Sequence, residues 1–167
     1  MPRIIFAILL MLMALIQTTI LPMGHVIGLT PDLVLVCLLL WSATREPREG
    51  LVWAFASGLF LDLLTLSPLG STALALLPVA IIGWLSRSRF FQSGLLFPLL
   101  MTMAATLAHG VALLLLAPLT GSHLNVIAGV RLALLGALLN AVLVPPFYLV
   151  VQLLDRWIGR NDTYARA

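Results

Sequence analysis

Two aspartates in otherwise apolar stretches are the first residues of this chain that could do chemistry. Asp32 lies in the sequence T-P-D-L, and Asp62 lies in F-L-D-L-L. Two carboxyl groups from different membrane helices would suit an intramembrane aspartyl protease, in which paired carboxyl groups act together. Neither context carries an independent sign of such catalysis, so the sequence does not favour a protease.

His109 and Arg131 are two further ionisable residues that fall within or beside apolar stretches. Each has a purely structural alternative: an interhelical hydrogen bond for the histidine, and an arginine that reaches the lipid phosphates. The chain contains no H-E-x-x-H, no G-x-S-x-G, no phosphate-binding loop and no cysteine–histidine cluster. We therefore predict no enzymatic activity, no metal site and no cofactor.

The composition is that of an integral membrane protein. Of the 167 residues, 62% are hydrophobic and 9% are charged, whereas a soluble domain carries about 25% charged residues. The net charge of +3 reflects membrane topology, and no nucleic-acid partner is predicted. The single cysteine, Cys37, excludes an intrachain disulfide. No soluble domain fits between the apolar runs, so residues 1–167 form one membrane domain.

The apolar runs predict an all-α protein with six transmembrane helices. A helix needs about 20 apolar residues to cross the hydrocarbon core, and the second and third runs are shorter than that. The first run is too long for a signal peptide and is interpreted as a retained span. The predicted spans are Ile4–Leu21, Pro31–Thr44, Gly50–Leu66, Ser71–Ser86, Gly94–Ala117 and Leu132–Leu154.

The arginines predict the orientation of these spans. All nine basic residues are arginines, and eight of them lie before the first span, in the second–third and fourth–fifth connections, or after the sixth span. The positive-inside rule makes that side cytoplasmic, so both termini are expected inside the cell. Arg131, near the outer end of the sixth span, is the exception.

The second span is predicted to be a short helix in which Asp32 begins below the outer surface. Thr30 is the expected N-cap, Pro31 the first helical residue, and Asp32 lies in the first turn. Measured at 1.5 Å per residue, Asp62 and His109 fall at a similar depth, about 18 and about 22 Å above the inner boundary. The three side chains predict a polar-lined depression that opens to the outside, with Thr102 and Thr106 also contributing.

Small residues predict two close helix contacts. Gly50, Ala54 and Gly58 recur at every fourth position, which lets two helix backbones approach in lipid. Gly70 permits the tight turn after Pro68. A second row on the last span is expected to be a packing face, and Pro145-Pro146 is expected to kink that span; the row is Gly129, Ala133, Gly136, Ala137 and Asn140.

Asp62 is expected to have a polar partner, because an unpaired carboxylate at membrane depth is costly. Judged by depth the partner would be His109, and judged by charge it would be Arg131; we favour His109. The structural alternative is a hydrogen bond to a neighbouring serine, threonine or backbone group.

From Thr30 to about Ser93 the chain resembles the bacterial rod-shape-determining membrane protein family MreD. The resemblance lies in P-D-L opening a short span, an arginine-containing turn, a Gly-x7-Gly-x3-Asp-Leu-Leu span and then S-P-L-G. Six spans, the chain length and a short basic tail also agree. The Pro145-Pro146 pair departs from the family pattern and leaves the register of the last span open.

The resemblance implies a non-enzymatic scaffold of lateral peptidoglycan synthesis in the bacterial cytoplasmic (inner) membrane. Such proteins pair with MreC, a single-span protein, and through it with cytoskeletal MreB, the polymerase RodA and a class B penicillin-binding transpeptidase. The family also looks like the substrate-binding S components of vitamin transporters, and a small-molecule transport subunit is the alternative function. The residues expected to organise the structure or the partner are Asp32, Gly58, Asp62, Gly70, His109 and Arg131.

Overall fold

A computed structural model describes residues 2–20, 30–90, 94–120 and 126–164, with side chains for 3–20, 30–88, 94–119 and 126–149. The described residues are helical and contain no β-strand. Helix α1 (Pro2–Leu15) continues as the π-helical η1 (Ile16–Ile20), and α5 (Leu96–Leu116) continues as the 3₁₀ turn η3 (Ala117–Thr120). The other helices are α2 (Leu33–Ser42), α3 (Pro47–Thr65), α4 (Ser71–Phe90) and α6 (Val126–Tyr164).

Four stretches of these helices are long and apolar enough to cross a membrane. They are Arg3–Ile20, Ser71–Ser88, Leu96–Leu119 and Val126–Leu149. Helix α3 has 19 residues but includes charged ones at its start, and α2 has only 10 residues. The all-helical fold is thus confirmed, whereas the six-span topology stays a prediction.

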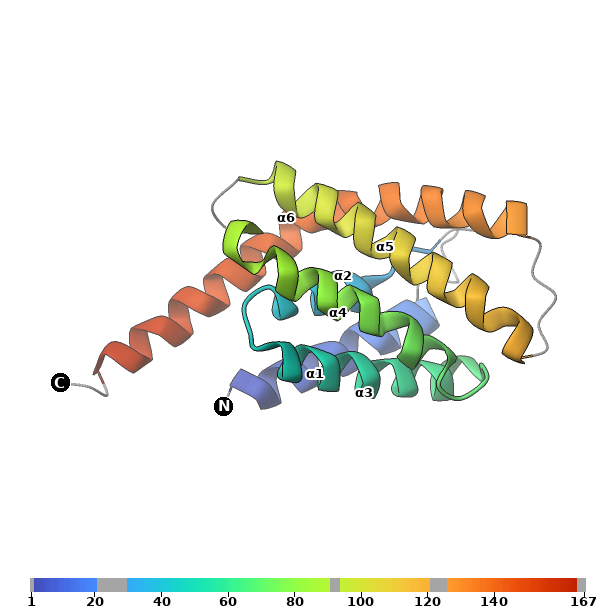
Figure 1. Ribbon diagram of the computed structural model, residues 1–167. Coiled ribbons are helices and arrows are strands. Elements are labelled where there is room, and N and C mark those ends of the chain that lie inside the picture. The colour runs from blue at the N-terminus through green and yellow to red at the C-terminus, as the bar shows by residue number, and fades with distance from the viewer. Residues whose placement is uncertain (1, 21–29, 91–93, 121–125, 165–167) are drawn as a thin grey trace.

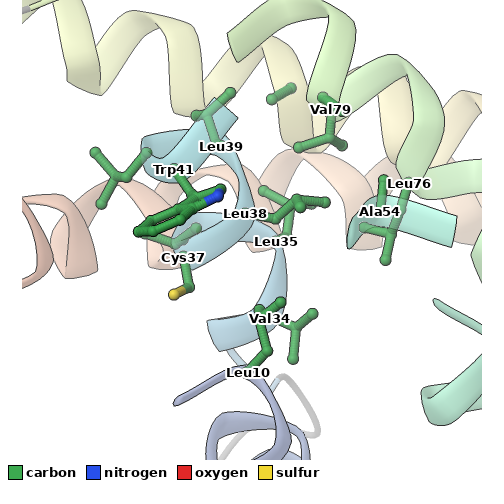
Figure 2. Packing of buried hydrophobic residues seen from close by; sticks show 14 of the residues in the cluster. Leu10, Val34, Leu35, Cys37, Leu38, Leu39, Trp41, Ala54, Leu76 and Val79 are labelled. Carbon is green, nitrogen blue, oxygen red and sulfur yellow. The ribbon is translucent and has the colours of Figure 1, made fainter. Parts of the chain in front are cut away.

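Helix α2 lies at the centre of the bundle. Every one of its ten residues is buried, and the residues are apolar except for the last, Ser42. Figure 2 shows its side chains meeting Leu10 of α1, Ala54 of α3, and Leu76 and Val79 of α4. A helix that is apolar all round can be stable only if it is surrounded, and this explains why a helix too short to cross the membrane still forms.

The arginine-rich segments gather at one end of the bundle. The beginning of α1, the α2–α3 connection, the end of α4, the beginning of α5 and the end of α6 all lie at the same end in Figure 1. Arg3 there forms an ion pair of 3.2 Å with Glu49. The Arg45 guanidinium lies 4.7 Å from the centre of the Trp41 ring, and Trp41 stacks on Phe6. This shared end agrees with the arginine pattern, although the side of the membrane that it faces stays a prediction.

Close helix crossings occur where the small residues predicted them. A Cβ atom added at Gly58 would lie 2.3 Å from the Ala73 Cα, so α3 and α4 touch backbone to backbone. On α6, Ala133 packs against Gly110 of α5, and Ala137 and Asn140 are buried. The proline pair lies inside α6, which changes direction along its length in Figure 1.

Candidate functional site

Asp62 holds together the connection between α3 and α4. Its carboxylate is fully buried and accepts hydrogen bonds from Gly70 N at 2.8 Å, Thr72 N at 3.0 Å and Ser71 Oγ at 3.3 Å. The Gly70 and Thr72 donors are backbone N–H groups at the start of a helix, where such groups lack partners within the helix, so Asp62 serves as the cap of α4 from the preceding helix.

The expected pairing of Asp62 with His109 is therefore wrong. The structural alternative, a bond to a neighbouring serine or backbone group, is the one that the structure contains. The pairing was inferred from the depth of each residue along its own helix. That comparison left out the α3–α4 turn, which folds back over Asp62 and supplies its hydrogen-bond donors. Gly70 makes this possible: its φ of +92° is a conformation that residues with a Cβ rarely adopt, and its N–H points at the carboxylate.

Asp32 is the N-cap of α2, and the helix begins at Leu33. The Asp32 Oδ1 atom accepts a hydrogen bond of 2.9 Å from Leu35 N. The prediction of Thr30 as N-cap was thus two residues early. Asp32 suits the N-cap position because its carboxylate reaches the third N–H group of the helix, as N-cap side chains typically do.

Two amide side chains complete the cap of α2 from other elements. The Gln17 Oε1 atom accepts a hydrogen bond of 3.1 Å from Val34 N, and the Asn140 Oδ1 atom accepts one of 2.7 Å from Asp32 N. Asn140 in turn donates to Thr106 Oγ1 at 3.1 Å. Helix ends within a bilayer need such partners, because lipid offers none. Sequence reasoning assigned Asn140 only to packing and missed Gln17, although an amide within an apolar span was a usable signal.

His109 of α5 faces Asp32 rather than Asp62. Its Nδ1 lies 3.8 Å from Asp32 Oδ2, which is an ion-pair distance but too long for a hydrogen bond. Its Nε2 is buried and has no hydrogen-bond partner among the described residues. The aspartate beside His109 is thus Asp32, not the Asp62 that was expected.

Arg131 lies away from this group. It is on the first part of α6 with its side chain exposed, and it does not line the cavity described next. No contact joins Arg131 to Asp62, whose bonds are with the α3–α4 turn. The structure thus leaves Arg131 as a surface residue.

A polar cavity of about 340 Å³ opens where α2 begins. Asp32 and His109 line it, as predicted, whereas Asp62, Thr102 and Thr106 do not. The two threonines are buried and donate their hydroxyl hydrogens to carbonyls of their own helix. The lining consists of eight polar residues and one leucine: Gln17, Thr18, Thr30, Asp32, Leu61, Thr65, Ser67, Thr72 and His109.

Comparison with known proteins identifies a family. The family model described as rod shape-determining protein MreD matches residues 1–154 of the chain. No curated protein and no solved structure gives a significant match.

Proposed function

Because this chain belongs to the MreD family of rod shape-determining membrane proteins, we propose that it is a scaffold of the lateral cell-wall synthesis complex. In this proposal the protein performs no chemistry of its own. It presents a fixed helical surface on which an MreC-like single-span protein docks. Through that partner it is joined to an MreB-like cytoskeleton, a RodA-like polymerase and a class B penicillin-binding transpeptidase.

The observation that supports a scaffold is how the buried and half-buried polar side chains are used. Asp62 caps α4, and Asp32, with Gln17 and Asn140, caps α2. Polar groups at membrane depth are costly, and here they hold helix ends in place. Such bonds fix the relative positions of the helices, and a fixed surface is what a docking protein requires.

The same proposal places the chain in the bacterial cytoplasmic membrane with six spans and both termini inside. The clustering of Arg3, Glu49 and Arg45 at one end of the bundle supports this orientation. Helix α2 alone covers about 15 Å, about half of the hydrocarbon thickness, so its start would lie near the middle of the bilayer.

A transport subunit that binds a small molecule is the second candidate, and the polar cavity favours it. Its volume of about 340 Å³ is within the range of ligand pockets. Its lining, however, contains no phenylalanine, tyrosine or tryptophan among the described residues. Small-molecule pockets are usually lined largely by apolar and aromatic side chains, so we place this candidate second.

Purification of the tagged protein in mild detergent separates the two candidates. A scaffold brings down a single-span coiled-coil protein, whereas a transport subunit brings down ATPase subunits and a bound small molecule. The matched variant is Asp32→Asn, which keeps the N-cap but removes the one carboxylate among the described lining residues. The scaffold proposal expects full partner recovery in this variant. Recovery of ATPase subunits without the single-span protein would overturn it.

A further inference from the structure

The polar cavity offers hydrogen-bond acceptors, because most of its hydroxyl hydrogens are already used. Thr18 donates to Ala14 O at 2.9 Å, and Thr65 donates to Leu61 O at 2.8 Å. Ser67 Oγ lies 2.8 Å from Thr65 Oγ1, and since the Thr65 hydrogen is committed, Ser67 is the donor in this pair. These three hydroxyls therefore have only lone pairs left for a ligand.

Asp32 adds a negative charge with a free oxygen. Its Oδ1 accepts from Leu35 N, but its Oδ2 has only the 3.8 Å approach of His109 Nδ1. The side chain is 19% exposed, and the residue lines the cavity. Among the described residues that line the cavity, Asp32 alone carries a formal charge when histidine is neutral. The cavity is therefore acidic and presents an incompletely bonded carboxylate.

An anion would find few backbone donors there, although two helices begin at the cavity. At the start of α2, the N–H groups of Val34 and Leu35 are bonded to Gln17 and Asp32. At the start of α4, the Thr72 N–H is bonded to Asp62. The helix ends, which usually attract anions, are thus already occupied by protein groups.

From this distribution we propose that the polar cavity binds a primary ammonium group, with Asp32 Oδ2 as its charged acceptor. An ammonium group brings three N–H donors to a cavity that has a carboxylate and hydroxyl lone pairs to accept them. The Gln17 amide oxygen is bonded to Val34 N, so its nitrogen is left to donate to an oxygen of the same ligand. A free aminoalcohol and a phosphatidylethanolamine headgroup both have this chemistry. The inference does not depend on the scaffold proposal.

The test measures the melting temperature of the delipidated protein in detergent. Ethanolamine hydrochloride is compared with ethylene glycol, which has no charge, and with choline chloride, which has no N–H donor, all at matched ionic strength. We expect a saturable rise of the melting temperature with ethanolamine, because a ligand that binds only the folded state stabilises it. The other two compounds should cause little or no rise.

Two variants locate the binding. In Asp32→Asn the ethanolamine effect should be lost, whereas Glu46→Gln removes an exposed carboxylate away from the cavity and should keep it. Thr65→Leu should also abolish the effect by filling the cavity while leaving Asp32 unchanged. This variant keeps the test decisive if Asp32→Asn does not fold. An effect that persists in Thr65→Leu, or in a folded Asp32→Asn protein, would overturn the proposal.

Short-chain phosphatidylethanolamine and phosphatidylcholine then identify the source of the ammonium group. Stabilisation by free ethanolamine assigns a free amine. Stabilisation by phosphatidylethanolamine alone, and not by phosphatidylcholine, assigns a lipid headgroup. If neither amine stabilises the wild-type protein, the cavity does not bind ammonium groups and the proposal fails, while the scaffold proposal is still judged by its own partner recovery.

Discussion

At the scale of single residues, Asp32 and Asp62 both cap a helix, but they use different numbers of carboxylate oxygens to do so. Asp62 uses both carboxylate oxygens, with Oδ2 bound by Gly70 N and Oδ1 by Thr72 N. Asp32 uses only Oδ1, which is bound by Leu35 N. An asparagine has one oxygen and one NH₂ group, so it can replace the second arrangement but not the first.

We predict that Asp62→Asn destabilises the protein and that Asp32→Asn changes its stability little. At position 62 the asparagine NH₂ group must face a buried N–H, which leaves donors without an acceptor at a cost of about 1–3 kcal/mol. Asp62→Leu, which removes both acceptors, should cost more. Thermal unfolding in detergent gives the comparison. Equal stability of Asp62→Asn and the wild type would show that the three bonds of Asp62 are dispensable.

These residues also show how far the sequence predicts the site. The sequence identified Asp32, Asp62 and His109, because ionisable side chains stand out in apolar helices. It could not identify their partners, since depth along a helix says nothing about rotation around it or about the path of the turn. Gln17 was missed because an uncharged amide stands out less than a charged group in an apolar helix. Its hydrogen bond to Val34 also joins two different helices, and the sequence does not show that these two residues meet.

At the scale of helices, the small-residue patterns predicted contacts well. Gly58 and Gly136 both lie in rows of small residues, yet they differ in the space around them. An added Cβ would lie 2.3 Å from Ala73 Cα at Gly58, but 3.9 Å from Thr106 Cγ2 at Gly136. The spacing of small residues therefore indicates a contact face without revealing which member has no room for a methyl group.

We predict opposite outcomes for Gly58→Ala and Gly136→Ala. At Gly58 the methyl group collides with the backbone of α4, and overpacking of this kind typically costs about 1–3 kcal/mol. At Gly136 the contact distance is ordinary, so the higher helix propensity of alanine, worth about 1 kcal/mol, should leave stability unchanged or raised. Melting temperatures of the two proteins decide the matter. A neutral Gly58→Ala variant would mean that α3 and α4 separate easily.

Helix limits were less predictable than helix identity. Helix α3 begins at Pro47, three residues before the predicted start at Gly50, because Pro47 suits a first helical turn and Glu49 interacts favourably with the helix N-terminus. The predicted start at Gly50 was the start of the apolar run, which leaves out charged residues. The α-helix itself can begin with charged residues, and it does so here. Helix α6 likewise continues to Tyr164, past the predicted end at Leu154.

At the scale of the whole molecule, orientation is the main expectation to be tested. Leu69 lies in the α3–α4 turn, and Ser88 lies near the other end of α4; both are exposed. The two positions therefore report on opposite ends of one helix that is long and apolar enough to span a membrane.

We predict that a cysteine at Leu69 reacts with an impermeant thiol reagent in intact cells and that a cysteine at Ser88 does not. The background variant is Cys37→Ser, which removes the single native thiol. Permeabilised cells serve as the control, because Ser88→Cys should then be labelled. Labelling of Ser88→Cys but not Leu69→Cys in intact cells would reverse the orientation.

In the six-span topology proposed above, the short central helix would also shape the voltage across the protein. In a plain bilayer the membrane potential falls over about 30 Å of hydrocarbon, but α2, with its 10 residues, provides only about 15 Å of apolar material below the polar cavity. In that topology, water in the cavity would concentrate the field on α2 and make it about twice as steep. Asp32 would then lie at nearly the potential of the solution that fills the cavity. A cation that enters from that side would reach this carboxylate without crossing most of the voltage.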